Sequence, residues 1–449
     1  RELFRNREAQ QAPKQVPVSD RVLFEYGGYF TFDYLSVDDT NGDNHVLRQY
    51  DPVLYARLNL DGVHEFFFRG RATYQDFAPG DSFDGEGSGL DGPTIDRLYY
   101  RFDLARNQER YGGKPAPVNV ALQGGRDLVY WGNGLTLAQV LDGAVVDLSR
   151  GPVALQLVAG LTPVHDTIDI DSSRPDFDDH TKRGFFGLML STQVGPHRPY
   201  VYGLMQRDYN DDETLDLAPT STRFDYNSYY IGIGSVGALG DKLLYGVEVV
   251  YEGGNTLSNS FEVDPPFLVP IEQTEDPISA AAVDVRLDYL FGDAGRTRAS
   301  VQATYATGDA DRFSSTSNTF GGNQPGTTDK AFNSFGLINT GLAFAPSVSN
   351  LIIVRTGVST FPLHDFAPLR RLQVGADVFV YNKANTNAPI DEPGFDERYL
   401  GWEPDIFLNW QITSDLTFAV RYGVFFPNED AFPNEDARQF ISTSVTYSF

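Results

Sequence analysis

Alternation of apolar and polar residues recurs along most of this chain, and it limits the possible folds more than any other feature. In the stretch "EFFFRGRATYQ", Phe66, Phe68 and Tyr74 share one face, while Arg69 and Arg71 share the other. A period of two residues is the pattern of a β-strand with two unlike faces. It is typical of a sandwich strand, and also of a membrane-barrel strand that turns its apolar face to lipid and its polar face to the lumen. The alternation alone does not separate these two folds.

The lengths of the connections do separate them. Eighteen strand candidates are centred near residues 29, 53, 70, 100, 122, 144, 158, 188, 204, 230, 248, 285, 303, 354, 376, 406, 421 and 443. Tight turns such as 149–152 and 292–295 alternate with long polar loops such as 78–94 and 311–346. A sandwich scatters its long loops over both ends, whereas an outer-membrane barrel keeps short turns on one rim and long loops on the other. The sequence therefore predicts an all-β fold, a single antiparallel transmembrane β-barrel of 18 strands, with short periplasmic turns and long extracellular loops.

Composition narrows the class further. No run approaches the roughly 18 uninterrupted apolar residues of a membrane helix. Cysteine is absent, which excludes disulfides and thiolate metal sites, and the formal charge of −26 argues against nucleic acid as a partner. We expect the barrel to occupy residues 21–449, in a bacterial outer membrane. Residues 1–20 are expected to form a periplasmic segment, either a frayed tail or a site for a periplasmic partner, and they are too short for the plug of a TonB-dependent transporter.

The last strand candidate, "ARQFISTSVTYSF", is expected to close the barrel against the first. Its alternation places Phe449, Tyr447 and Val445 towards lipid and the hydroxyl residues between them towards the lumen. An aromatic residue at the end of such a strand resembles the signal read by the outer-membrane assembly machinery. We therefore expect this machinery, membrane lipids and lipopolysaccharide to be partners of the protein.

Acidic residues gather in the long loops, most densely in "HDTIDIDSSRPDFDD" at 165–179. Carboxylates there are candidates for binding Ca²⁺ or for bridging to lipopolysaccharide through divalent ions. Their spacing does not match an EF-hand loop, and a solvated acidic loop is the alternative. No other cofactor is expected. The candidate metal ligands are Asp166, Asp169, Asp171, Asp176, Asp178 and Asp179.

Arginine dominates the positions that the alternation turns into the lumen. Inward arginines are predicted at Arg57, Arg69, Arg71, Arg97, Arg101, Arg286, Arg298, Arg355, Arg371 and Arg421. Inward carboxylates are predicted at Glu25, Asp33, Glu65, Asp103, Glu248, Asp284, Asp288, Asp377 and Asp405. One interpretation is cross-strand ion pairing that braces a wide lumen. The other is an arginine belt that lowers the barrier to a carboxylate-bearing solute.

Two segments resemble alginate-export outer-membrane proteins. One is "VALQGGRDLVYWGNGLTLAQVLDGAVVDLSRGPVALQLVAG", in which a strand ending in Gly-Arg precedes a tryptophan-bearing loop. The other is "YLGWEPDIFLNWQITSDLTFAVRYGVFFPNEDAF" near the end of the chain. The resemblance implies an eighteen-stranded barrel that passes an anionic polysaccharide through an arginine-rich constriction, with loops partly occluding the pore. It also implies that Arg126 lines the pore. Strict alternation points Arg126 outward, so this role requires a bulge at Gly124–Gly125.

Three functions compete at this stage. The first is a pore for diffusion or export of anionic or small polar solutes, with loop 311–346 folded into the lumen as a gate. The alternative is a structural or adhesive outer-membrane protein that uses its acidic loops for calcium-mediated contacts. An enzyme is disfavoured because the six histidines fall mostly in loops and turns, and no Ser–His pair falls on adjacent lipid-facing strands.

Overall fold

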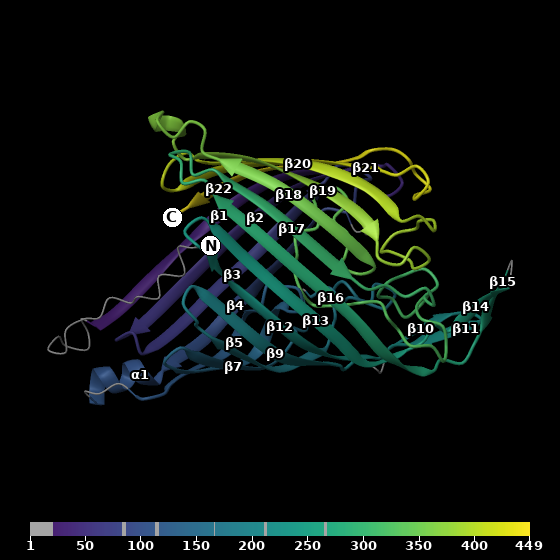
Figure 1. Ribbon diagram of the computed structural model, residues 1–449, viewed down its shortest axis with the longest axis horizontal. Coiled ribbons are helices and arrows are strands. Elements are labelled where there is room, and N and C mark those ends of the chain that lie inside the picture. The colour runs from purple at the N-terminus through teal and green to yellow at the C-terminus, as the bar shows by residue number, and fades with distance from the viewer. Residues whose placement is uncertain (1–20, 83–86, 113–115, 166, 211–212, 265–266) are drawn as a thin grey trace.

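A closed barrel is the main feature of the computed structural model, which describes residues 21–449 apart from 83–86, 113–115, 166, 211–212 and 265–266. Eighteen strands form one antiparallel sheet, and the last strand, β22 (Arg438–Ser448), pairs with the first, β1 (Val22–Asp38). Closure leaves no free sheet edge, so every barrel strand has two hydrogen-bonded neighbours. The predicted fold and the predicted closure are confirmed (Figure 1).

The sixteen barrel strands between these two follow one another around the ring in chain order. They are β2 (Asn44–Leu60), β3 (His64–Phe77), β4 (Gly89–Asp103), β5 (Asn119–Tyr130), β6 (Ala138–Arg150), β7 (Val153–Leu161), β8 (Arg183–Thr192), β9 (His197–Asp208), β12 (Tyr226–Leu239), β13 (Leu243–Leu257), β16 (Glu275–Leu290), β17 (Arg298–Ala306), β18 (Leu351–Thr360), β19 (Leu372–Lys383), β20 (Tyr399–Gln411) and β21 (Leu416–Pro427). Each of the eighteen predicted strand centres lies inside its strand.

The two faces of the wall follow the alternation. In β12, Tyr229, Ile231 and Ile233 are exposed on the outer face, whereas Ser228 and Tyr230 are buried on the inner face. Because the side chains of a strand alternate between the two faces of the sheet, register alone then assigns each residue of a neighbouring strand to the lumen or to the outer surface.

The two rims differ as predicted. Short turns, helix α1 (Leu104–Asn107), the π-helix η2 (Gln108–Gly112) and the 3-10 helix η3 (Ala367–Leu369) lie on one rim, which also holds the C-terminus (Figure 1). The other rim carries the long loops and two hairpins that the alternation did not predict. These hairpins pair β10 (Thr214–Leu217) with β11 (Thr220–Arg223) and β14 (Phe261–Asp264) with β15 (Phe267–Pro270).

One strand boundary differs from the sequence expectations. Strand β4 begins at Gly89, so the loop predicted at 78–94 ends earlier than expected. The predicted periplasmic segment, residues 1–20, lies outside the described residues. Among the described residues, no helix is long and apolar enough to cross a membrane.

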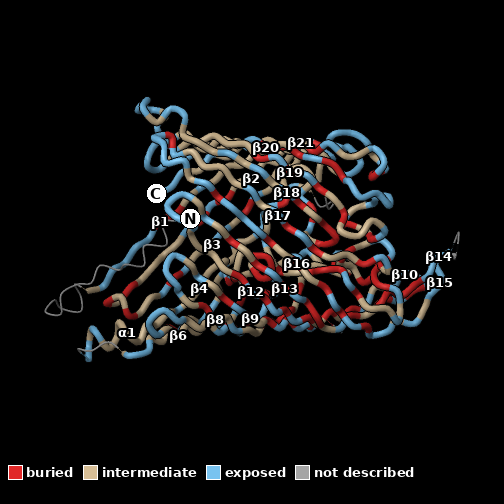
Figure 2. Tube along the Cα trace, viewed as in Figure 1, coloured by how far each residue is buried: buried red, intermediate tan, exposed pale blue. Residues whose placement is uncertain are grey.

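The buried apolar core lies inside the barrel, where loops pack against the inner wall. One cluster joins Trp131 and Phe335 to wall residues such as Tyr230, and a second joins Phe379 to Phe425. Figure 2 shows buried residues along β12, β13 and β16 and towards the loop-bearing rim. A barrel of 18 strands is too wide for wall side chains alone to fill, so segments that fold inward supply the missing core.

Candidate pore and its inner loop

The connection between β17 and β18, residues 307–350, folds into the lumen, and we call it the inner loop. It pairs first with the wall, where the Asp329 N–H donates to the Pro277 carbonyl at 2.9 Å and the Ser279 N–H donates to the Asp329 carbonyl at 2.8 Å. Farther along, Phe332 is buried, as is Phe335. The expectation that segment 311–346 enters the lumen is confirmed, and a gating role stays a prediction.

Two wall carboxylates hold the inner loop through its backbone. Glu252 of β13 accepts the Asn333 N–H at 2.9 Å, and Glu403 of β20 accepts the N–H groups of Leu342, Ala343 and Phe344 at 2.5, 2.8 and 2.9 Å. Both glutamates are buried. Consecutive backbone N–H groups form a concave donor set that suits a carboxylate, and hydrogen bonds to a charged acceptor are stronger than neutral ones. These contacts fix the inner loop at two separate points of the wall.

A second segment, residues 131–137 between β5 and β6, also turns inward, and we call it the tryptophan loop. The indole N–H of Trp131 donates to Gln156 of β7 at 2.6 Å, and the Asn133 N–H donates to Glu248 of β13 at 2.5 Å. The loop pairs with the inner loop at Gly336, where an added Cβ would lie 2.3 Å from the carbonyl oxygens of two tryptophan-loop residues. Only glycine permits this approach, so the two loops form one packed unit.

Six of the arginines expected inside the pore, on β2, β3, β4 and β18, lie on the inner face in ion pairs. Arg69 makes a two-pronged contact with Asp96, and Arg355 contacts Asp377 with both of its distances at 2.9 Å. The others pair as Arg57 with Glu25 and Glu65, Arg71 with Asp51, Arg97 with Asp127, and Arg101 with Asp147. Cross-strand bracing, one of the two interpretations of these positions, therefore describes all six. Arg286 of β16 and Arg298 of β17 also face inward, and both pair with Asp288.

Arg421 and Arg371 differ from these six. Arg421 of β21 lies opposite Phe407 and Ser442 in the ladders, on the inner face, and its side chain is exposed. No carboxylate among the described residues pairs with it. Arg371 is exposed in the turn immediately before β19, so it lies at the short-turn rim rather than on the wall.

The expectation that Arg126 lines the pore is wrong for this structure. Arg126 lies opposite Leu98 in the β4–β5 ladder, on the outer face, and that ladder runs without a register shift past Gly124 and Gly125. Its guanidinium instead contacts Asp142 of β6 at 2.6 and 2.7 Å and donates to the Ile95 carbonyl at 2.8 Å. Without a bulge, the alternation keeps Arg126 on the outer surface.

The acidic loop, residues 162–182, does not gather its described aspartates into one site. Asp169 is buried between Arg174 and Arg183, with contacts of 2.7 Å to each. Burial raises the pKa of Asp169, but the two guanidiniums lower it more, so the net pKa lies below the ordinary value of 3.8. Asp171 is also buried, whereas the remaining candidates, Asp176, Asp178 and Asp179, are exposed and Asp166 lies outside the described residues.

Sequence reasoning missed Glu252 and Glu403, the two carboxylates that hold the inner loop. The alternation had already turned Glu248 and Asp405 inward, and the same parity places Glu252 and Glu403 beside them. That parity was the available signal. It does not say which backbone reaches these groups, because the inner loop and the wall meet only when the barrel closes.

Comparisons with solved structures define the class. Crystal structures of Pseudomonas aeruginosa OpdO and OccK1 (OpdK) match with TM-scores of 0.53 and 0.54, each at 10% identity. The matches cover 96% and 95% of this chain and 99% and 98% of those chains, respectively. The structure of OpdK with vanillate matches with a TM-score of 0.53. No match is found among curated proteins. The fold is therefore that of an outer-membrane porin.

This protein is an outer-membrane β-barrel with a pore for solute diffusion or export. The family model "Alginate export" matches residues 155–440, and the chain belongs to that family. These findings do not favour the adhesive alternative. The segment around Arg126 lies before the matched region, so the match does not support a pore role for this arginine.

Proposed function

We propose that the pore passes carboxylate-bearing solutes, anionic polysaccharide among them, along the arginines of β2, β3, β4 and β21. The observation that carries the proposal is the division of the lumen. The two inward loops are hydrogen-bonded to β7, β12, β13, β16, β19 and β20. Strand β16 is the twelfth of the ring of 18 and lies opposite β3, the third. The loops therefore dock mainly on the wall opposite β2, β3 and β4, and their docking extends to β20, the neighbour of β21.

The charged arginines of the lumen suit weak, repeated binding of solute carboxylates. A guanidinium has five N–H donors, so an arginine paired with one carboxylate retains donors for a second. Conduction requires contacts that are strong enough to admit a solute and weak enough to release it. Partly neutralised arginines such as Arg71, whose side chain is 46% exposed, meet this condition, and the unpaired Arg421 supplies the strongest attraction. Solutes would move through the pore by reversible binding alone, without any covalent chemistry.

Current block in a planar bilayer tests this function. Oligouronates added to one side should interrupt the current more often than neutral oligosaccharides of the same length, and added salt should reduce the difference because it screens charge. Equal block by charged and neutral oligomers would show that the solute carboxylates are not recognised. The absence of any channel current would refute the pore itself.

A further inference from the structure

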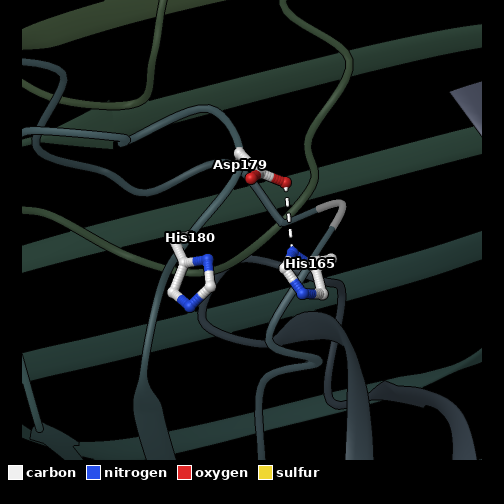
Figure 3. A group of neighbouring side chains, drawn as sticks. All are labelled: His165, Asp179 and His180. Atoms are coloured by element: carbon white, nitrogen blue, oxygen red, sulfur yellow. Dashed lines mark hydrogen bonds and ion pairs between the residues drawn. The ribbon is translucent and has the colours of Figure 1, made fainter.

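Two histidines and an aspartate meet in the acidic loop, away from the lumen arginines. Nδ1 of His165 lies 3.4 Å from Oδ1 of Asp179, and the rings of His165 and His180 are 4.9 Å apart with an angle of 85° between their planes. One ligand atom from each residue falls within 4.8 Å of the other two. Figure 3 shows the three side chains around one space, with His165 coming from the other arm of the loop.

The backbone brings these residues together without any ion. Beyond the ends of β7 and β8, the Thr162 N–H donates to the Arg183 carbonyl and the Thr162 hydroxyl donates to the Thr181 carbonyl, both at 2.9 Å. These bonds close the neck of the loop. On the returning arm, the His180 N–H donates to the Asp176 carbonyl at 2.7 Å. The turn thus presents residues 179 and 180 towards the first arm.

We propose that His165, Asp179 and His180 bind a divalent transition-metal ion, with Zn²⁺ the best fit. Imidazole nitrogen with a single carboxylate is a donor set for zinc, whereas Ca²⁺ prefers six to eight oxygen ligands. Ligands at about 2.0–2.2 Å from one ion lie roughly 3–4 Å apart, so small side-chain rotations bring the donors into place. Three protein ligands leave at least one position for water or another donor. Of the six aspartates that the sequence offered as candidate calcium ligands, the site includes only Asp179.

The same loop also holds the inner loop. Asp171 accepts the Thr319 N–H at 2.9 Å, the Ser173 hydroxyl accepts the Phe320 N–H at 3.2 Å, and the Ser172 N–H donates to Asn318 at 2.9 Å. Residues 318–320 belong to the outer arm of the inner loop. An ion at the neck therefore restrains the segment on which that arm rests. We infer that metal added on the loop-bearing side reduces fluctuations of the channel current.

Titration of the purified, folded barrel with ZnCl₂ tests the site directly. The wild-type protein should bind one Zn²⁺ per chain, and the double variant His165→Ala/His180→Ala should bind at least tenfold more weakly. His364→Ala is the matched control because His364 lies beside one carboxylate, Asp365, at 3.3 Å but has no second histidine in that contact. The heat-modifiable electrophoretic shift of each variant verifies folding. Absence of stoichiometric binding, or equal affinity in the double variant, would overturn the site.

Single-channel recording tests the link to the inner loop. Zn²⁺ on the loop-bearing side should lower the frequency of current fluctuations in the wild-type channel and in His364→Ala, but not in the double variant. Binding of Zn²⁺ without a change in the current would overturn the link. These readouts do not depend on carboxylate recognition, so the metal site and the proposed solute class fail independently.

Discussion

Besides the cross-strand ion pairs of the inner wall, arginine occupies three other settings in this barrel, and its position decides its role. Arg421 is exposed on the inner face without a carboxylate partner among the described residues, whereas Arg126 is paired on the outer face. Arg183 is buried beneath the acidic loop between Asp169 and Asp208. The same guanidinium therefore remains free to meet a solute, as we propose for Arg421, or it neutralises an outer-face carboxylate or fixes a loop, according to what surrounds it.

Replacing Asp169 with Asn should loosen the acidic loop. The change leaves Arg174 and Arg183 buried with one fewer charge partner, and breaking a buried pair costs about 3–5 kcal/mol. Hydrogen exchange should show lost protection across residues 162–182. The exposed Asp178→Asn variant is the control and should retain wild-type protection.

Through Asp169, acid should affect this loop only at low pH. Because the folded pKa of Asp169 lies below 3.8, its contribution to stability is fully present above that value and is lost as the pH falls below it. Protection of residues 162–182 should therefore be unchanged between about pH 7 and pH 5 at this site. A loss of protection at pH 5 that Asp169→Asn abolishes would contradict this assignment.

Because Arg126 and Asp142 pair on the outer face, we expect their substitutions to have non-additive effects on the free energy of unfolding. Arg126→Leu alone leaves Asp142 without its two-pronged partner, at an expected cost of about 1–3 kcal/mol in the free energy of unfolding. Arg126→Leu/Asp142→Leu should recover that loss, because both outer-face charges are then gone. Denaturant unfolding in lipid vesicles measures the cycle. Additive losses, or altered conductance in the double variant, would contradict the placement of Arg126.

At the scale of elements, the inward loops depend on a few carboxylates. Glu403→Gln replaces an acceptor of three backbone N–H groups by an amide with one acceptor oxygen and two donors. Each donor left unsatisfied costs about 1–3 kcal/mol, so the inner loop should detach more often. Single-channel recordings should show more frequent conductance steps, and protease should cut residues 307–350 faster.

Glu25→Gln is the matched control for this element. Glu25 is also an inner-wall carboxylate, but it pairs with Arg57 at 3.4 Å rather than with the backbone of an inward loop. The current steps and the cleavage rate should therefore remain those of the wild type. Equal effects of the two substitutions would show that charge in the lumen, rather than loop docking, controls the current.

Local pattern was sufficient for the strands but not for the loops. The alternation in "EFFFRGRATYQ" depends only on neighbouring residues, and it assigned Arg69 and Arg71 to the inner face correctly. The alternation also placed Arg126 correctly on the outer face, whereas the motif resemblance wrongly implied that it lines the pore. The contact of Glu403 with the inner loop joins residues about 60 positions apart, which no periodicity records. The meeting of His165 with His180 likewise depends on how the acidic loop folds.

At the scale of the whole molecule, one side of the lumen holds the docked loops, and we propose that the other side is the solute path. Buried carboxylates on β13 and β20 hold the inner loop and the tryptophan loop, while β2, β3 and β4 carry arginines on the opposite side. A wide barrel needs such a division, because loops must fill part of the lumen without closing the solute path.

Closure of the whole barrel gives a further prediction about assembly. Tyr447 and Phe449 are 53% and 65% exposed on the outer face where β22 meets β1, and we propose that they act with Val445 as an assembly signal. Phe449→Ala should lower the folded fraction in the outer membrane, measured by heat-modifiable electrophoresis. Phe426→Ala is the control, because it removes another exposed aromatic side chain from the outer face, on β21. Equal losses in both variants would indicate a general effect of aromatic removal.

The binding of oligouronates to the open channel tests the central claim, that the arginine side of the lumen is the solute path. Planar-bilayer recordings should give a dissociation constant roughly tenfold higher for Arg421→Gln than for the wild type, because a charge-assisted hydrogen bond is lost. Arg150→Gln, at the end of β6 on the short-turn rim, should leave the constant unchanged. An unchanged constant in Arg421→Gln, with the inner-wall variants Arg71→Gln and Arg101→Gln equally without effect, would contradict the claim.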